Sequence, residues 1–287
     1  MMKISTPTID MKGRTALITG AGAGIGRGIA EAFGALGARI IGAEIDPERG
    51  AATQSALQAA GVSAEFHVCD VRDGAQLRAL VAGLDARGEG IDTLVNNVGD
   101  SIGEFMHPFD QAPEALWDEL YAINLRHVFT ASQAALPLLR RRAPGSTIIN
   151  VSSIEAFRAI PMCPVYSAFK HAITGFTRSL ALLLGPEGIR VNTIAPETTE
   201  TEQVKPSQYV KPELQENIRR WTPLGRFGEP RDMAGCAVFL ASELSAWVTG
   251  TTVHADGGAL AAAGFYRTPS GHWTNTPIVT GDGFGFS

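Results

Sequence analysis

Tyr166 and Lys170 stand four residues apart in the stretch "VYSAFKHAITGF" at 165–176. At this spacing two side chains project from the same face of a helix, one turn apart. A phenol can give up and take back a proton, so a phenol beside an ammonium group suggests acid–base chemistry. The alternative is structural: Tyr166 would anchor the helix start, and Lys170 would be a surface charge.

A glycine-rich stretch, "TALITGAGAGIGRGIAEAF", offers a second kind of chemistry near the N-terminus. Gly20, Gly24 and Gly26 permit a tight turn and let backbone amides approach a pyrophosphate at a helix N-terminus. Glu44 follows eighteen positions after Gly26 and ends the run "ARIIGAE". A carboxylate there can accept hydrogen bonds from the adenosine ribose and would repel a 2′-phosphate, which predicts NAD rather than NADP.

Other interpretations of this region stay open. An ordinary strand-to-helix turn can also carry glycines, and Glu44 could be a solvated carboxylate at a strand end. Arg39 and Arg49 flank the region and could serve a 2′-phosphate if they fold back towards it.

Seven β-branched runs alternate with longer amphipathic stretches along the chain. The strands and helices that they predict must position the Tyr166–Lys170 pair and the glycine-rich stretch. Strands bounded this regularly by helices indicate a parallel sheet that is covered on both faces. We therefore predict an α/β fold with one doubly wound Rossmann domain at 1–258 and a C-terminal extension at 259–287. The expected strands are "TALIT", "ARIIGAE", "AEFHVCDV", "IDTLVNNVG", "STIINVSS", "IRVNTIAP" and "TTVHADGG".

The composition narrows the class of protein. The chain has 287 residues, of which 45% are hydrophobic and 18% charged, and this is typical of soluble globular proteins. A formal net charge of -5 argues against a nucleic-acid-binding surface. No apolar run is long enough to span a bilayer and the N-terminus lacks a signal-peptide pattern, so a cytoplasmic location is expected. The three cysteines lack metal-ligand spacing, so no metal site is predicted; Cys69 and Cys236 are expected in the core, and Cys163 could line a pocket.

From residue 12 to 258 the sequence closely resembles the short-chain dehydrogenase/reductase family. The matching stretches occur in the family's order: "TGAGAGIG", "CDV" at 69–71, "NNVG" at 96–99, "AINL" around Asn124, "NVSS" at 150–153, "YSAFK", "RVNTIAP" and "TGTTVHADGG".

The resemblance implies a catalytic tetrad of Asn124, Ser153, Tyr166 and Lys170. Tyr166 would take the alcohol proton as hydride leaves for the cofactor, and Lys170 and the oxidised nicotinamide would favour its phenolate. Ser153, chosen over Ser152 by family spacing, would hold the substrate oxygen. Lys170 would also bind the nicotinamide ribose, and Asn124 would support a water that links Lys170 to solvent.

The resemblance also assigns cofactor contacts beyond the glycine loop and Glu44. Asp70 and Val71 would border the adenine, Asn97 and Gly99 the ribose, and Ile25 the nicotinamide; for Val71 and Ile25 core packing is an equal explanation. Thr201 would match the threonine that helps hold the carboxamide or pyrophosphate, and Pro196, Thr199, Tyr166 and Lys170 are further expected cofactor contacts.

Two residues depart from the family pattern. Val98 replaces the commoner alanine, and Glu197 replaces the glycine that usually follows Pro196. A carboxylate at 197 would be repelled by a pyrophosphate, so it must point away or face the substrate. The expected substrate wall comprises 100–102, 155–163 and a polar lid at 197–221, and its acidic members favour a neutral substrate.

These observations predict an NAD-dependent oxidoreductase that interconverts a secondary alcohol and a ketone. The runner-up is a 3-oxoacyl-thioester (carrier-protein) reductase that uses NADPH. A non-catalytic NAD(H)-binding protein, or an enzyme that catalyses dehydration or epimerisation, are further alternatives.

The helix that starts near Tyr166 also carries signs of assembly. Its apolar stripe lies beside a row of small residues, which permits close approach of the sheet or of another subunit. The family resemblance implies a homotetramer or homodimer. The aromatic tail is expected to dock over its own cleft or a partner's. The row consists of Ala168, Ala172, Gly175 and Ser179.

Overall fold

The computed structural model describes residues 9–210, 212–262, 266–267 and 273–274. Its centre is a seven-stranded parallel sheet, and each of the seven predicted runs contributes one strand. The prediction of a doubly wound α/β fold is therefore confirmed. The strands are β1 (Thr15–Thr19), β2 (Arg39–Glu44), β3 (Ala64–Val68), β4 (Thr93–Asn96), β5 (Thr147–Val151), β6 (Arg190–Pro196) and β7 (Thr252–Ala255).

The strand order, β3-β2-β1-β4-β5-β6-β7, places the first strand inside the sheet. The chain winds from β1 to β2 and β3 in one direction and then returns to β4 on the other side of β1. Crevices for ligands form at the carboxyl ends of the strands where the winding reverses. The glycine-rich turn after β1 lies at this point.

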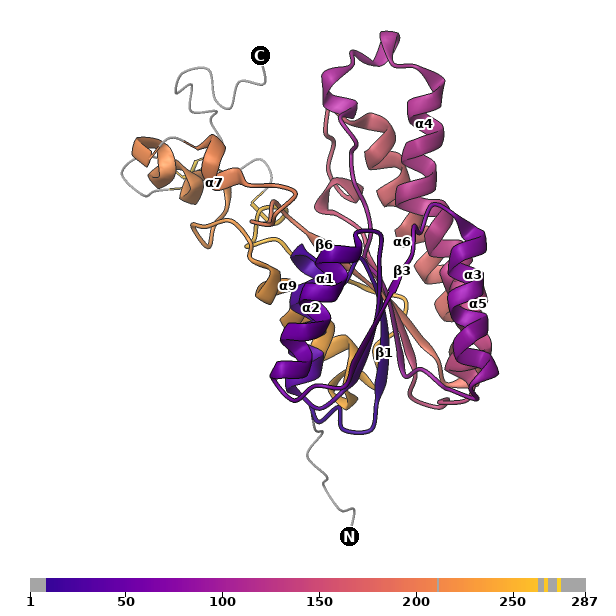
Figure 1. Cartoon of the computed structure of the whole chain (residues 1–287). Helices are drawn as coiled ribbons and strands as arrows, with labels where there is room; N and C mark the ends of the chain where they lie inside the picture. Colours follow the sequence, from indigo (N-terminus) through magenta and orange to yellow (C-terminus); the bar gives the residue numbers. More distant parts are fainter. Residues whose placement is uncertain (1–8, 211, 263–265, 268–272, 275–287) are drawn as a thin grey trace.

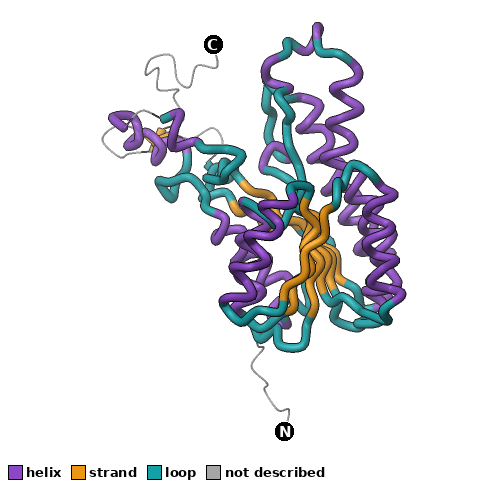
Figure 2. The backbone as a smooth tube through the Cα atoms, in the orientation of Figure 1, coloured by secondary structure: helices purple, strands orange, loops and turns teal. Residues whose placement is uncertain are grey.

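Helices cover both faces of the sheet (Figures 1 and 2). On one side α1, α2 and α9 pack, with α1 and α9 in direct contact; on the other lie α3, α5 and α6. Each face encloses its own apolar core, one around Ile29 and Phe33, the other around Leu94 and Leu138. The covering helices are α1 (Gly24–Ala35), α2 (Pro47–Ala59), α3 (Gly74–Ala86), α5 (His127–Arg140), α6 (Pro164–Leu184) and α9 (Pro230–Ala241).

Two excursions rise beyond the carboxyl edge of the sheet, as Figure 1 shows. One follows β4 and includes α4, the other follows β6 and includes α7, and the expected lid at 197–221 is part of the second. The remaining elements are η1 (Glu104–Met106), η2 (Phe109–Gln111), α4 (Glu114–Tyr121), the π-helical turn η3 (Ala122–Arg126), η4 (Ile154–Ala156), η5 (Gly185–Glu187), α7 (Pro206–Tyr209), η6 (Pro212–Asn217), α8 (Ile218–Trp221) and η7 (Glu243–Ser245).

The C-terminal extension is described at two short strands, β8 (Tyr266–Arg267) and β9 (Trp273–Thr274), which pair antiparallel. β8 contacts α8, so this part of the extension lies beside the lid. The other tail residues expected to dock, 265, 284 and 286, fall outside the described residues, and the domain boundary at 258 stays a prediction. Within the part of the chain that the structure describes, no helix has the length and apolar character needed to cross a bilayer.

The close approach of α1 to β1 requires glycine at position 26. A Cβ added at Gly26 would lie 2.2 Å from the Gly20 carbonyl oxygen and 2.6 Å from Asn97 Nδ2. Backbone cannot yield to such a contact without displacing the helix. This geometry explains Gly26 without any ligand.

Replacing Gly26 by alanine should therefore lower the free energy of unfolding by about 1–3 kcal/mol, the usual cost of overpacking. Gly83 is the control, because it lies exposed within α3 and an added Cβ meets nothing within 4 Å. Gly83→Ala should raise stability by about 0.5–1 kcal/mol through helix propensity. Urea denaturation measures both; equal effects would contradict the close-approach argument.

Candidate active site

The first turns of α6 bring Tyr166 and Lys170 together. Pro164 occupies the first position of this 21-residue helix, where the N–H that proline lacks would have no partner within the helix. Lys170 is 3% exposed, and its Nζ lies 5.5 Å from the centroid of the partly exposed Tyr166 ring. The surface-charge interpretation of Lys170 is therefore excluded.

The two serines after β5 have different partners. The Ser153 hydroxyl acts on the Tyr166 phenol and lowers its pKa, and the Ser153 Oγ accepts from the Glu155 backbone N–H at 3.2 Å. The Ser152 hydroxyl donates to the Lys170 backbone carbonyl at 2.7 Å. Ser153 thus faces the phenol, whereas Ser152 fixes the helix that carries it.

Asn124 and Gly99 close the site on the β4 side. Asn124 lies fully buried in η3, and its Nδ2 donates to the carbonyls of Asp100 (2.7 Å) and Leu120 (3.0 Å). The Asp100 N–H donates back to Asn124 Oδ1 at 3.1 Å. A Cβ added at Gly99 would approach Lys170 Nζ below any ordinary contact distance. The lysine head group therefore occupies the space that a side chain at position 99 would take.

Burial dominates the electrostatics of the pair. It raises the pKa of the Tyr166 phenol well above the ordinary ~10; the Ser153 hydrogen bond opposes this rise, and the carboxylates of Glu155 and Asp100 add to it. Burial likewise lowers the pKa of Lys170 to about 8, with Asp100 acting against the shift. In the chain by itself the phenol therefore keeps its proton at neutral pH, and the expected phenolate-favouring effect of Lys170 is outweighed.

The glycine-rich turn contacts Glu44 directly. Glu44 is 5% exposed; its Oε2 accepts from the Gly22 N–H at 3.0 Å, and its Oε1 lies 3.1 Å from Arg49 Nη2. Gly20 and Gly24 have φ of 64° and 52°, which favour glycine. Arg39 lies at the opposite end of β2, where it pairs with Glu65 and Glu89, so only Arg49 of the two arginines is near Glu44.

Of the other proposed cofactor residues, Asn97 and Asp70 make polar contacts, whereas Val71 and Ile25 pack against apolar side chains. Asn97 Nδ2 donates to the Thr19 carbonyl at 3.0 Å beside the glycine loop, and Asp70 is held by Arg72 in an ion pair of 2.8 Å that lowers the pKa of its carboxyl group. Val71 and Ile25 pack on the two apolar cores, as their structural explanation required.

The segment after Pro196 brings one of its two proposed threonines to the glycine loop. Thr201 lines a cavity of about 390 Å³ together with Gly24, Glu202 and Lys205. Thr199 is 7% exposed, and its hydroxyl donates to the Glu197 carbonyl at 2.8 Å, within its own turn.

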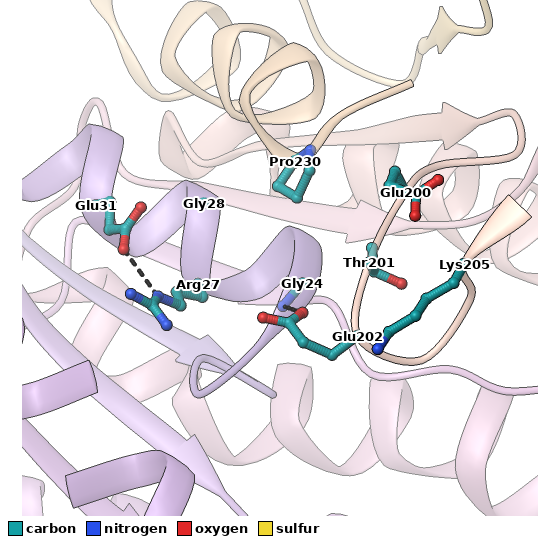
Figure 3. A pocket seen from close by; sticks show the side chains of 9 residues that line it. All are labelled: Gly24, Arg27, Gly28, Glu31, Glu200, Thr201, Glu202, Lys205 and Pro230. Atoms are coloured by element: carbon teal, nitrogen blue, oxygen red, sulfur yellow. Dashed lines mark hydrogen bonds and ion pairs between the residues drawn. The ribbon is translucent and has the colours of Figure 1, made fainter. Parts of the chain in front are cut away.

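Figure 3 shows the Glu202 carboxylate reaching the N-terminus of α1. Its Oε2 accepts from the Gly24 N–H at 2.8 Å. The partial positive charge at a helix N-terminus favours any anion there, whether a carboxylate or a phosphate. The amide expected to meet a pyrophosphate is thus bonded by the lid.

Comparison with known proteins places this geometry in a family. The family model described as enoyl-(acyl carrier protein) reductase matches residues 20–259. A solved short-chain type dehydrogenase/reductase from Mycobacterium ulcerans superposes with a TM-score of 0.80 at 27% identity, over 88% of this chain and 91% of that one. The chain belongs to the short-chain dehydrogenase/reductase family.

Several relatives of known activity are dehydrogenases. Galactitol 2-dehydrogenase of Agrobacterium fabrum is 37% identical over 86% of this chain and 98% of its own length. 2-Dehydro-3-deoxy-D-gluconate 5-dehydrogenase of Bacillus subtilis is 36% identical over 88% and 96%. A 7α-hydroxysteroid dehydrogenase solved with NADH and 7-oxo glycochenodeoxycholic acid matches with a TM-score of 0.79 at 32% identity, over 87% and 95%. The protein is thus an oxidoreductase of a family that binds a nicotinamide cofactor.

The family motifs gave no indication of Glu104, which holds the start of α6. Glu104 is 2% exposed; its Oε1 accepts from the Val165 N–H at 2.8 Å and its Oε2 from the Tyr166 N–H at 2.9 Å. Cys163, at the N-cap, makes no side-chain cap. A helix start without a capping side chain indicates that some other group must bond its first amides. That group, the Glu104 carboxylate, lies about sixty residues upstream, so the local sequence could not identify it.

Glu104→Ala should lower the free energy of unfolding by about 1–3 kcal/mol, because it leaves two buried amides without a partner. Asp110→Ala, an exposed carboxylate six residues further along the same loop, should change it by less than about 0.5 kcal/mol. Chemical denaturation of both variants measures the difference. Equal stabilities would show that Glu104 does not fix the helix start.

Proposed function

We propose that the protein is an NAD-dependent dehydrogenase that interconverts a secondary alcohol and a ketone, with Tyr166 as the acid–base group. The observation that carries this proposal is the grouping of three side chains: the Ser153 hydroxyl acts on the Tyr166 phenol and lowers its pKa, and the Nζ of the buried Lys170 lies 5.5 Å from the centroid of the Tyr166 ring. A substrate oxygen between the two hydroxyl groups would be held by Ser153 and would exchange its proton with Tyr166. The nicotinamide supplies the hydride acceptor or donor.

The protonation of the pair suits each direction differently. For ketone reduction, the high pKa of Tyr166 keeps the donated proton on the phenol at neutral pH. For alcohol oxidation the phenol must first lose that proton. Lys170 is the neighbouring group that can relay a proton, because its lowered pKa lets it gain and lose one near neutral pH. Asn124 would hold the water that joins Lys170 to solvent.

Replacing Tyr166 by phenylalanine tests the acid–base role. Turnover should fall by about 10²–10⁴-fold, the usual contribution of a general acid or base, while NADH binding stays within a few-fold of wild type. Turnover is followed by nicotinamide absorbance with a panel of secondary alcohols and ketones, and binding by NADH fluorescence. Near-normal turnover would move the role to another group.

We propose NAD as the preferred cofactor because Glu44 ends β2 beside the glycine turn. Its carboxylate is buried and its position is set by the Gly22 amide, so a 2′-phosphate would bring negative charge against a fixed anion. Asp70, Asn97, Gly99, Pro196 and Thr201 are proposed as further cofactor contacts. Arg49, which pairs with Glu44, is the neighbouring cation that would favour NADP instead.

Glu44→Gln should therefore raise the affinity for NADP relative to NAD by about tenfold or more, since it removes the repelling charge and keeps the side-chain size. Michaelis constants for the two cofactors measure the ratio. Glu48→Gln, at an exposed position in α2, is the matched control and should leave it unchanged. A wild-type preference for NADP would refute the Glu44 assignment.

A carrier-protein reductase is the second candidate, and the description of the matching family model favours it. Against it, the late part of α6 presents exposed Leu182 and Leu183 rather than basic residues for an acidic carrier. Acetoacetyl thioesters assayed beside free alcohols separate the two.

We also propose that α6 takes part in a homotetramer or homodimer. In the single chain, Ala168, Gly175 and Ser179 of the small-residue row are exposed, and a second subunit would cover them.

A further inference from the structure

Glu197, the departure from the family's glycine, is a buried carboxylate directly after β6. It is 7% exposed, and its Oε1 accepts from the Thr198 N–H (2.8 Å) and the Thr198 hydroxyl (2.9 Å). Its Oε2 lies 2.7 Å from Arg158 Nη2. The carboxylate is thus turned towards the expected substrate wall.

Arg158 joins its own segment of that wall, 155–163, to both ends of the lid at 197–221. Its guanidinium pairs with Glu155 at 2.8 Å and with Glu197, and it lies 5.9 Å from the centroid of the Trp221 ring in the lid. Nε and Nη2 hydrogen-bond to Glu155, Nη2 also forms the ion pair with Glu197, and Nη1 makes no hydrogen bond with the described residues. Its side chain is 26% exposed, against 13% for Glu155 and 5% for Glu197, so Arg158 is the accessible member.

This group lies close to the proposed reaction centre. The Glu155 N–H donates to Ser153 Oγ, and the Glu155 carboxylate is one of the charges that raise the pKa of Tyr166. Burial raises the pKa of Glu197, whereas the Thr198 hydrogen bonds and Arg158 stabilise its ionised form; with both carboxylates ionised the group carries a net charge of −1, and Asp100 adds a further negative charge near the same phenol.

We propose that the group formed by Glu155, Arg158 and Glu197 selects an uncharged, polyhydroxylated alcohol or ketone, and that Glu197 determines this selectivity. The inference rests on the proposed dehydrogenase function. A substrate carboxylate would meet an arginine whose charge is already neutralised and a surplus of negative charge. An apolar substrate would take water from the guanidinium and from Glu155 without replacing its hydrogen bonds.

Hydroxyl groups satisfy both sides of this group at once. A hydroxyl oxygen accepts from Arg158, and its proton can be donated to a free lone pair of Glu155. A site built to hydrogen-bond such groups discriminates strongly against analogues that lack them, because its own polar atoms are then left without partners.

The test compares four- to six-carbon alditols, the aldonates of the same chain lengths, and cyclohexanol as an apolar secondary alcohol. For the wild-type protein with NAD, kcat/KM should be at least about tenfold higher for the best alditol than for the best aldonate or cyclohexanol. A preference for an aldonate or for cyclohexanol would overturn the inference and leave the dehydrogenase standing. Absence of nicotinamide reduction with the whole panel would overturn the inference and count against the proposed function.

Glu197→Gln then tests the determinant. Removing one charge should shift the alditol-to-aldonate ratio of kcat/KM towards the aldonate by about tenfold. Glu216→Gln removes the same charge from the exposed pair with Arg219 elsewhere in the lid and should leave the ratio unchanged. An unchanged ratio in Glu197→Gln, with a melting temperature near wild type, would overturn the role of Glu197. An equal shift in the control would do the same, because it would reduce the effect to net charge.

Discussion

The burial of the Lys170 ammonium beside Tyr166 is the constraint on which the site depends. A buried charge is costly unless it is paired or hydrogen-bonded, and the surrounding elements meet that requirement in parts. The Val151 carbonyl accepts from Nζ at 3.4 Å, Asp100 supplies the opposing charge, and Gly99 leaves the space. The segments after β4, the end of β5 and the π-helical turn that holds Asp100 through Asn124 must all be in place for these groups to meet. The fold therefore determines the chemistry by fixing one lysine.

The same burial works against the simplest account of the pair. A cation near a phenol should lower the pKa of the phenol. Desolvation instead raises the pKa of Tyr166, and it also lowers the pKa of Lys170. Both shifts favour the neutral forms, because loss of solvent destabilises the charged form of each group more than its neighbours stabilise it. In the proposed function, the positive charge of an oxidised nicotinamide would then be the further interaction that favours the phenolate.

Local sequence signals predicted much of the molecule. All seven strands follow β-branched runs bounded by turns, and family spacing singled out Ser153, which the structure places against Tyr166 while Ser152 bonds the helix backbone. These features depend on residues close together in the chain. The alternative role of Arg39 depended instead on the direction of a strand: Arg39 is the first residue of β2 and Glu44 the last, so the two lie at opposite ends and Arg39 pairs with Glu65.

The contacts that could not be predicted from the sequence are those between loops that lie far apart along the chain. Glu104 reaches the amides of Val165 and Tyr166, and Glu197 reaches Arg158. Neither contact has a periodicity or a motif, because each depends on how two irregular segments meet above the sheet. The sequence did identify Glu197 as an anomaly, since a carboxylate in place of glycine required a partner or a different direction. It could not show that an arginine 39 positions earlier was that partner.

The three carboxylates of the segment after β6 have three different kinds of partner. Glu197 turns to Arg158, Glu200 accepts from Ser207, and Glu202 bonds the Gly24 amide. Only the last uses a group that the proposed cofactor also needs. A pyrophosphate at the Gly24 amide would displace a carboxylate of like charge, and the segment that carries it leads to Trp221 against Arg158. Binding at the glycine turn and the shape of the substrate wall would then be linked, because one stretch of chain contacts both.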